Sequence, residues 1–383
     1  MPVIKSTNFF LVIVVFSQFA GTSLWFAGNA IIDQISKTGT HASITSFVQF
    51  GFIAGTLVFS LLTIADRFSA ANVFFYSSLL AALANLLIIW LSKNAFALSL
   101  LRFVTGFFLA GIYPVGMKIA ADLFPEKLGK ALGFLVGALV LGTSFPHFVR
   151  SQLQAIHWQS VIYATSFLAC TGGLLIWFFI PKKKKAAVMQ KPDLSVAFSV
   201  FRSKPFRSAA FGYFGHMWEL YAFWSILPIL FAYYNQTNNK AGNVYFWSFL
   251  VIAVGSLGCA YGGLLSQKWG SKKVAFYALL LSGICCVVVP LFFTASSSVF
   301  YLLFLVWGIS VVADSPQFSA LVAKNAEEKN KGTALTIVTS IGFAITIVSI
   351  QLLKGFFQAH SAYGLWLLAI GPLFGLLSLK SSK

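Results

Sequence analysis

The chain has 383 residues, of which 58% are hydrophobic and 9% are charged, and its mean hydropathy is +0.84. A water-soluble domain carries about a quarter of its residues as charged side chains, so this composition excludes one and predicts a membrane protein. The net charge of +18 would suit nucleic-acid binding in a soluble protein. In a membrane protein, basic residues gather in the cytoplasmic loops, so we expect no nucleic-acid partner.

Apolar runs of about 20 residues, each long enough to cross a bilayer as a helix, follow one another along the chain. Charged or Gly-, Asn- and Ser-rich breaks separate them. They lie at 8–32, 43–64, 72–92, 95–120, 128–149, 158–181, 209–234, 244–266, 274–294, 299–322, 332–354 and 362–380. The sequence therefore predicts an all-α membrane protein with twelve transmembrane helices.

The first run differs from a secretory signal peptide, whose apolar region covers about 7–15 residues before a small-residue cleavage site. It continues past Ala20 and Gly21 to Ile32, so we expect an uncleaved first helix. The fifth run contains Pro146 and several glycines, and we expect it to bend or to pack closely against a neighbour.

The distribution of basic residues sets the orientation. If the N-terminus is cytoplasmic, 21 of the 27 lysines and arginines fall on the cytoplasmic side, as the positive-inside rule requires. We therefore predict a multi-pass protein of the cytoplasmic (inner) membrane, surrounded by lipid, with both termini in the cytoplasm.

The longest loop, 182–208, divides the chain in half and begins with four lysines. We predict a cytoplasmic linker there, with a short interfacial helix at 194–201 and lysines near anionic headgroups. The predicted organisation is one six-helix bundle at 1–181, the linker at 182–208, and a second bundle at 209–383.

The two halves of the sequence repeat each other. The loop after the second run, Leu62 to Ser69, corresponds to the loop after the eighth, Gly263 to Lys273, at an offset of 201 residues. The fourth and tenth runs correspond at an offset of 202: Arg102, Gly106 and Pro114 match Phe304, Gly308 and Pro316. A nearly constant offset indicates duplication of a six-helix unit.

These loops resemble the signature G-x-x-x-D-R/K-x-G-x-K/R-K/R of the major facilitator superfamily. The second copy has Gln267 in place of the Asp, and the first copy lacks both glycines. The resemblance implies two pseudo-symmetric six-helix bundles, a cavity lined by helices 1, 4, 7 and 10, and alternating access. It also implies that the loop residues gate the conformational change: Asp66, Arg67, Gly263, Gln267, Lys268 and Gly270.

Ionisable residues inside the bilayer are costly and usually functional. Glu219 lies about 15 Å into the seventh run, near the midplane, and His216 precedes it by one turn on the same face. An imidazole beside a carboxyl group can exchange a proton near neutral pH, so we expect proton coupling here. The alternative is a satisfied structural pair.

Arg102 and Asp314 are the other deeply placed charges. Arg102 matches an arginine that the superfamily associates with proton coupling, but it could instead snorkel or bond the carbonyls of a neighbouring helix. Asp314 precedes Pro316, which weakens the helix. A broken helix with a carboxylate could take part in coupling, or could be a structural kink.

Further polar and aromatic residues on the helices expected around the cavity are candidates for substrate binding, although packing or lipid contact is the alternative at each position. Gln18 corresponds to Glu219 at the offset of 201. The full set is Gln18, Trp25, Asn29, Tyr113, Tyr221, Trp224 and Gln317.

These features predict a secondary transporter for a small organic solute or anion, proton-coupled and monomeric. Arg102 and the positive charge favour an anion. A multidrug efflux antiporter and a transporter-like sensor without flux remain alternatives. No nucleophile–base pair, metal-ligand cluster or Walker loop occurs, and the four cysteines form no CxxC motif, so we expect neither an enzyme, a metal nor a cofactor.

Overall fold

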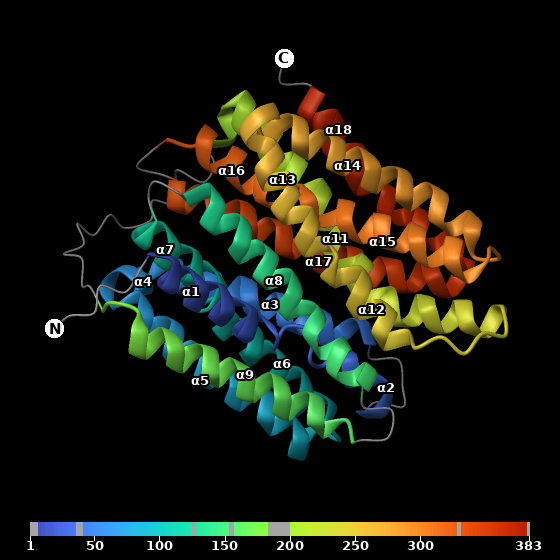
Figure 1. Cartoon of the computed structure of the whole chain (residues 1–383), viewed down its shortest axis with the longest axis horizontal. Helices are drawn as coiled ribbons and strands as arrows, with labels where there is room; N and C mark the ends of the chain where they lie inside the picture. The colour runs from blue at the N-terminus through green and yellow to red at the C-terminus, as the bar shows by residue number, and fades with distance from the viewer. Residues whose placement is uncertain are drawn as a thin grey trace. The chain divides into compact units, whose positions relative to one another are not determined.

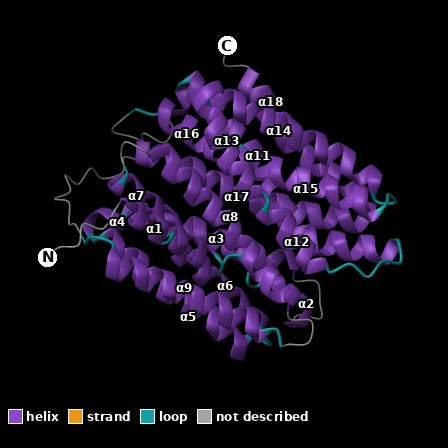
Figure 2. Cartoon of the chain, viewed as in Figure 1, coloured by secondary structure: helices purple, strands orange, loops and turns teal. Residues whose placement is uncertain are grey.

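The structure is a computed structural model that describes residues 7–35, 41–124, 128–152, 157–182, 200–327 and 331–380. Every regular element in these ranges is a helix, and none of them contains a β-strand (Figure 2). The predicted all-α fold is therefore confirmed. By its internal contacts the chain divides into two compact units, Met1–Pro192 and Asp193–Lys383.

The first unit contains the blue to green helices of Figure 1. Within it α3 packs along α6, α5 packs along α9, and α1 contacts α8 and α9. Its helices are α1 (Thr7–Thr22), η1 (Asn29–Ile31), α2 (Ile32–Ile35), α3 (His41–Leu61), α4 (Ile64–Arg67), α5 (Ala70–Leu91), α6 (Ala95–Leu109), α7 (Tyr113–Leu123), α8 (Leu128–Gln152) and α9 (Gln159–Phe179).

In the second unit, coloured yellow-green to red in Figure 1, the long helix α11 packs against α17 and α18. Its elements are η3 (Val200–Arg202), α11 (Lys204–Thr237), α12 (Val244–Ala253), α13 (Gly255–Trp269), α14 (Ser271–Val288), η4 (Val289–Phe292), α15 (Ser297–Ala313), α16 (Ser315–Asn325), α17 (Lys331–His360), η6 (Ser361–Ala369) and α18 (Ile370–Lys380).

Each of the twelve predicted ranges contains a helix. Among the described residues, nine helical stretches are long and apolar enough to cross a membrane. The last of these, Gly332–Lys380, has 49 residues and includes two predicted spans. α1 is apolar but has fewer than the 18 residues required of such a stretch. α11 is not among the nine stretches, and it carries the polar residues discussed below. These findings fit twelve crossings.

The first span is broken, whereas the sequence predicted a continuous helix. α1 ends at Thr22, and turns occupy the next six residues before η1 begins. The hydroxyl of Thr22 donates to the carbonyl of Gln18 (2.8 Å), and that of Ser23 donates to the carbonyl of Ala20 (2.7 Å). Such back-bonding competes with the helical pattern. The turn segment is buried, so it is part of the core.

The fourth and tenth spans break at corresponding places. α6 stops at Leu109 and α7 resumes at Tyr113, while α15 stops at Ala313 and α16 resumes at Ser315. Each second helix carries a proline in its first turn, Pro114 or Pro316. Because proline has no amide hydrogen, it cannot bond the carbonyl four residues before it.

Close helix crossings repeat the symmetry seen in the sequence. A side chain on Gly106 of α6 would overlap the carbonyl of Val48 on α3, and one on Gly308 of α15 would overlap the carbonyl of Val251 on α12. Only glycine permits this approach. The duplication is therefore present in the packing within each unit as well as in the sequence.

One helix boundary differs clearly from its predicted position. α11 begins at Lys204 instead of residue 209, because Ser203 caps it by accepting a hydrogen bond from the amide of Phe206 (3.5 Å) and Pro205 suits its first turn. Pro146 lies inside a continuous α8, and the fifth span packs closely against a neighbour as expected, because a Cβ on Gly142 would overlap the carbonyl of Phe19 on α1. Most of the interfacial helix predicted at 194–201 lies outside the described residues, which resume at Val200.

Candidate functional site

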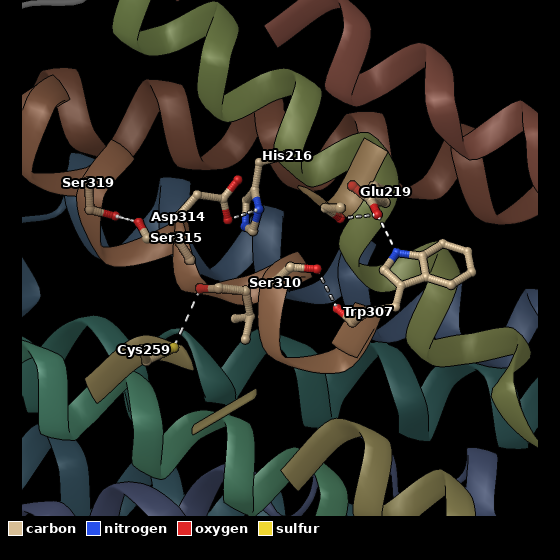
Figure 3. A network of polar contacts seen from close by, with 10 residues as sticks. His216, Glu219, Cys259, Trp307, Ser310, Asp314, Ser315 and Ser319 are labelled. Carbon is tan, nitrogen blue, oxygen red and sulfur yellow. Dashed lines mark hydrogen bonds and ion pairs between the residues drawn. The ribbon is translucent and has the colours of Figure 1, made fainter. Parts of the chain in front are cut away.

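Glu219 lies in the core of the second unit with 1% of its surface exposed. Its Oε1 accepts three hydrogen bonds: from the indole nitrogen of Trp307 (2.6 Å), from the thiol of Cys286 (3.3 Å) and from the hydroxyl of Ser282. Figure 3 shows the indole pointing at the carboxyl group. Ser282 and Cys286 belong to α14 and Trp307 to α15, so one carboxyl group joins α11 to two other helices.

The ring of Trp307 is fixed on its other side as well. Phe223 lies one turn after Glu219 on α11, and its ring stacks on the indole with centroids 4.2 Å apart and planes 24° apart. Such pairs contribute about 0.5–1.5 kcal/mol beyond the burial of their surface. α11 and α15 are thus held together by an adjacent polar and aromatic contact.

His216 and Asp314 form a second buried contact between α11 and the helix break. Nδ1 of His216 lies 2.8 Å from Oδ1 of Asp314, and both side chains are 1% exposed. The two groups point toward each other in Figure 3. Within the described residues, neither Nε2 of His216 nor Oδ2 of Asp314 has a hydrogen-bond partner. The pair therefore keeps unused hydrogen-bonding capacity.

The break at Asp314 is stabilised by local bonds. The backbone carbonyl of Asp314 accepts from the amides of Gln317 (3.0 Å) and Phe318 (2.9 Å), which starts α16. The thiol of Cys259 lies 3.5 Å from the carbonyl of Val312 and donates to it. This is the carbonyl that Pro316 leaves without a helical donor.

The expected pairing of His216 with Glu219 is wrong. The two side chains lie one turn apart on α11, but each bonds to a different part of the tenth span. Sequence reasoning also missed the donors Ser282, Cys286 and Trp307. Their separation from Glu219 by 63 to 88 positions leaves no local pattern that would have identified them.

Arg102 is fully buried in the first unit and bonds the broken end of the first span. Its guanidinium donates to the carbonyls of Leu24 (3.2 Å) and Trp25 (2.5 Å), and to Oδ1 of Asn85 (3.4 Å). Arg102 therefore bonds carbonyls of a neighbouring span, one of the alternatives considered for it, and its role in proton coupling stays a prediction. These carbonyls need donors because α1 has ended at Thr22.

Asn85 on α5 extends this network. Its amide nitrogen donates to the hydroxyls of Thr165 (3.1 Å) and Ser166 (2.9 Å) on α9. Sequence analysis did not identify Asn85, although an asparagine within an apolar span is the kind of signal that could have found it. Arg102 and Asn85 together thus link the first, third, fourth and sixth spans of the first unit.

The substrate-binding candidates separate by unit. In the first, Gln18 and Trp25 are fully buried, Asn29 donates to the hydroxyl of Thr45 (2.5 Å), and Tyr113 at the start of α7 is half-buried. In the second, the rings of Tyr221 and Trp224 are 5.4 Å apart, and Gln317 is buried one turn after Asp314. No group of three metal-ligating side chains occurs in the described parts of the chain.

Comparison with known proteins decides the family. A family model described as the Major Facilitator Superfamily matches residues 10–350. The chain belongs to the major facilitator superfamily. It is also 28% identical over 217 residues to the putative uncharacterized transporter YgaY of Escherichia coli K12 and to its counterpart in strain O157:H7. These matches cover 52% of this chain, and the chain spans about half (53%) of the length of these curated relatives.

Solved structures show the same fold. The Escherichia coli fucose:proton symporter FucP aligns over 99% of this chain and 100% of its own, with a TM-score of 0.69 and 15% identity. FucP in an outward conformation gives a TM-score of 0.71 with the same identity and coverage. At this identity the likeness shows the fold alone. The family membership, together with the apolar helices, makes the chain a multi-pass membrane protein.

The two signature segments predicted to gate the conformational change differ in conformation between the halves. In the first, Nε of Arg67 donates to the hydroxyl of Thr63 (3.2 Å), and Lys118, which sequence analysis did not single out, donates to the carbonyl of Ala65 (2.7 Å). The side chain of Asp66 lies outside the described residues. In the second, Gly263, Gln267 and Lys268 lie on α13, and the latter two are exposed.

Gly270 ends α13 with φ at 79° and ψ at 147°, a conformation that residues with a Cβ rarely adopt. We expect Gly270→Ala to destabilise the protein by about 1–3 kcal/mol through backbone strain alone, because no atom lies within 4 Å of the added carbon. The matched control is Ser69→Ala, the corresponding residue, whose φ is −58°. Thermal unfolding of both purified variants measures the difference, and equal melting temperatures would contradict the strain argument.

Proposed function

We propose that this superfamily member is a proton-coupled secondary transporter that moves a small organic solute across the cytoplasmic membrane by alternating access. The observation that carries the proposal is the pair of buried carboxyl groups, Glu219 and Asp314, which both attach α11 to the tenth span. Burying an acidic group in the membrane costs free energy, so such groups are usually kept for a function.

Protonation of these groups would change how the helices are held. A carboxylate accepts charge-assisted hydrogen bonds that are about twice as strong as neutral ones. Adding a proton to Glu219 removes that charge from its bonds to Ser282, Cys286 and Trp307. Adding a proton to Asp314 likewise weakens its attraction to His216. Proton binding would therefore loosen α11 from α14 and from the broken span, which links proton occupancy to helix movement.

The comparisons support this proposal at the level of the fold and family. FucP is named as a fucose:proton symporter, and YgaY as a putative transporter. Rings such as Phe223 and Trp307 stack on each other, so packing accounts for them without an aromatic substrate. The aromatic residues of α11 and α15 therefore add little support for drug efflux.

The proposal is tested by flux into proteoliposomes with and without an imposed pH gradient, across a panel of anions, amino acids, sugars and dyes. We expect at least one solute to accumulate only when the gradient is present. Asp314→Asn should reduce that accumulation by about tenfold or more, because the buried imidazole loses its carboxylate. Accumulation that ignores the gradient in the wild type would contradict proton coupling.

Topology gives a separate prediction. We propose that both termini and the 182–208 loop are cytoplasmic, since that orientation places most lysines and arginines inside. Single cysteines introduced at Ser203, which precedes α11, and at Asn239, which follows it, should react with an impermeant thiol reagent from opposite sides. Reaction of both from one side would rule out a single crossing between them.

A further inference from the structure

The three donors to Glu219 all reach the same carboxyl oxygen. The indole nitrogen of Trp307, the thiol of Cys286 and the hydroxyl of Ser282 donate to Oε1, and none of these groups bonds Oε2. All three donors are fully buried, as is the carboxyl group itself apart from 1% of its surface. The two oxygens of Glu219 therefore have different surroundings, and a proton does not bind equally well to both.

The donors differ in what they can do when a proton arrives. A hydroxyl or a thiol can rotate and accept a hydrogen bond instead of donating one, whereas an indole N–H can only donate. The oxygen that carries the proton of a carboxyl group is a poorer acceptor than the carbonyl oxygen. Trp307 therefore favours Oε1 as the acceptor in both the ionised and the protonated form of Glu219.

Aromatic packing holds the indole of Trp307 in this position. The ring is fully buried, it stacks on Phe223, and the ring of Phe304 lies 5.9 Å from it between centroids. Phe223 belongs to α11 and follows Glu219 by one turn. The helix that carries the carboxyl group thus also holds the ring that donates to it.

The titratable groups that face Glu219 come from α14 and from the break in the tenth span. They are the thiols of Cys285 and Cys286, and the carboxyl group of Asp314, which is itself paired with His216 on α11. α15 carries no charged side chain, and the basic residues of α14, α16, α17 and α18 lie within two turns of a helix end. Within the described residues, hydrogen bonds rather than an ion pair therefore stabilise a charge on Glu219.

We propose that Trp307 is a positioning residue for the proton of Glu219: its indole N–H holds Oε1 as an acceptor, so that Oε2 is the atom that binds and releases the proton. The inference rests on the proposed function and names the atom at which the coupling site works. An O–H bond forms at Oε2 when a proton is taken up and breaks when it is released. The hydrogen bonds on Oε1 weaken without breaking, because the carboxylate charge is lost.

Infrared difference spectroscopy of the purified full chain in lipid, recorded as the pH is changed, tests the position of the proton. The carbonyl stretch of a protonated carboxyl group falls in frequency with each hydrogen bond that the carbonyl oxygen accepts. The band of Glu219 is identified by its absence from Glu219→Gln. If Oε1 is the carbonyl oxygen, Trp307→Phe should raise the frequency of this band, because it keeps a ring against Phe223 and removes the N–H.

The same titration gives the pH at which half of Glu219 is protonated. Loss of a donor to the carboxylate destabilises the ionised form, so the midpoint in Trp307→Phe should move about one unit to higher pH. The matched control is Trp218→Phe. Trp218 immediately precedes Glu219 on α11, but its indole donates to the backbone carbonyl of Leu367 (3.0 Å). We expect this control to keep the wild-type frequency and midpoint.

The inference is overturned if Trp307→Phe keeps the frequency and midpoint of the wild type, or if Trp218→Phe shifts both equally. It is also overturned if the wild type shows no titrating band that Glu219→Gln removes. If Trp307→Phe does not fold, Ser282→Ala removes another donor to the same oxygen and should also raise the frequency. An unmoved band in that variant would place the proton on Oε1 and contradict the proposal.

Flux separates this inference from the proposed function. If the band and its midpoint shift as expected but the accumulation of every solute ignores the pH gradient, proton coupling is wrong and the position of the proton stands. If accumulation follows the gradient and Trp307→Phe leaves the band unmoved, coupling stands and the role of Trp307 is wrong.

Discussion

Replacing Glu219 with glutamine is expected to abolish pH-driven accumulation while leaving exchange of substrate at equal concentrations intact. Glutamine keeps the volume of the side chain and an oxygen that can still accept from Trp307 and Ser282. It cannot bind or release a proton. Accumulation needs net proton movement, whereas exchange needs only the movement of substrate, so the two activities should separate.

The control for this variant is Ser282→Ala, which removes one of the three donors to Glu219 and keeps the carboxyl group. We expect it to retain gradient-driven accumulation, because the carboxyl group can still bind and release a proton and keeps its donors Cys286 and Trp307. Surviving exchange in the glutamine variant shows that it has folded. If that variant still concentrates substrate under a pH gradient, Glu219 is not the coupling group and Asp314 is the next candidate.

Replacing Arg102 with methionine is expected to destabilise the first unit by about 2–5 kcal/mol, because the carbonyls of Leu24 and Trp25 and the amide oxygen of Asn85 lose their donors. The apparent melting temperature should fall by roughly 5–10 °C. Arg102→Lys should give an intermediate value, since an ammonium group cannot span the same three acceptors.

Arg207→Met is the matched control for Arg102. Arg207 also donates to two backbone carbonyls, those of Phe201 and Arg202, but it is exposed. Water can replace its hydrogen bonds, so we expect a change within about 0.5 kcal/mol. An Arg102→Met protein that melts like the wild type but loses proton coupling would contradict the structural role and support the predicted coupling role of Arg102.

The sequence by itself determined the membrane class, the twelve apolar ranges and the duplication. These properties are local: a bilayer of fixed thickness demands about 20 apolar residues per helix, and a duplicated unit keeps its spacing. A weak point in the helix near Asp314 was also predictable, because Pro316 has no amide hydrogen to donate to the carbonyl four residues before it. The superfamily motifs then implied the fold, which the structure and the family comparison confirm.

Only the tertiary structure decided which polar groups meet. Adjacent turns of α11 suggested that His216 and Glu219 act together, but α14 and α15 supply the partners of Glu219, and the broken tenth span supplies Asp314. The first span looked continuous in sequence because its apolar run is unbroken. The carbonyls at its broken end accept hydrogen bonds from Arg102 on another helix, a contact that only the structure shows. Helix packing brings these residues together across about 60 to 100 positions of chain, and hydrophobic periodicity carries no information about such pairs.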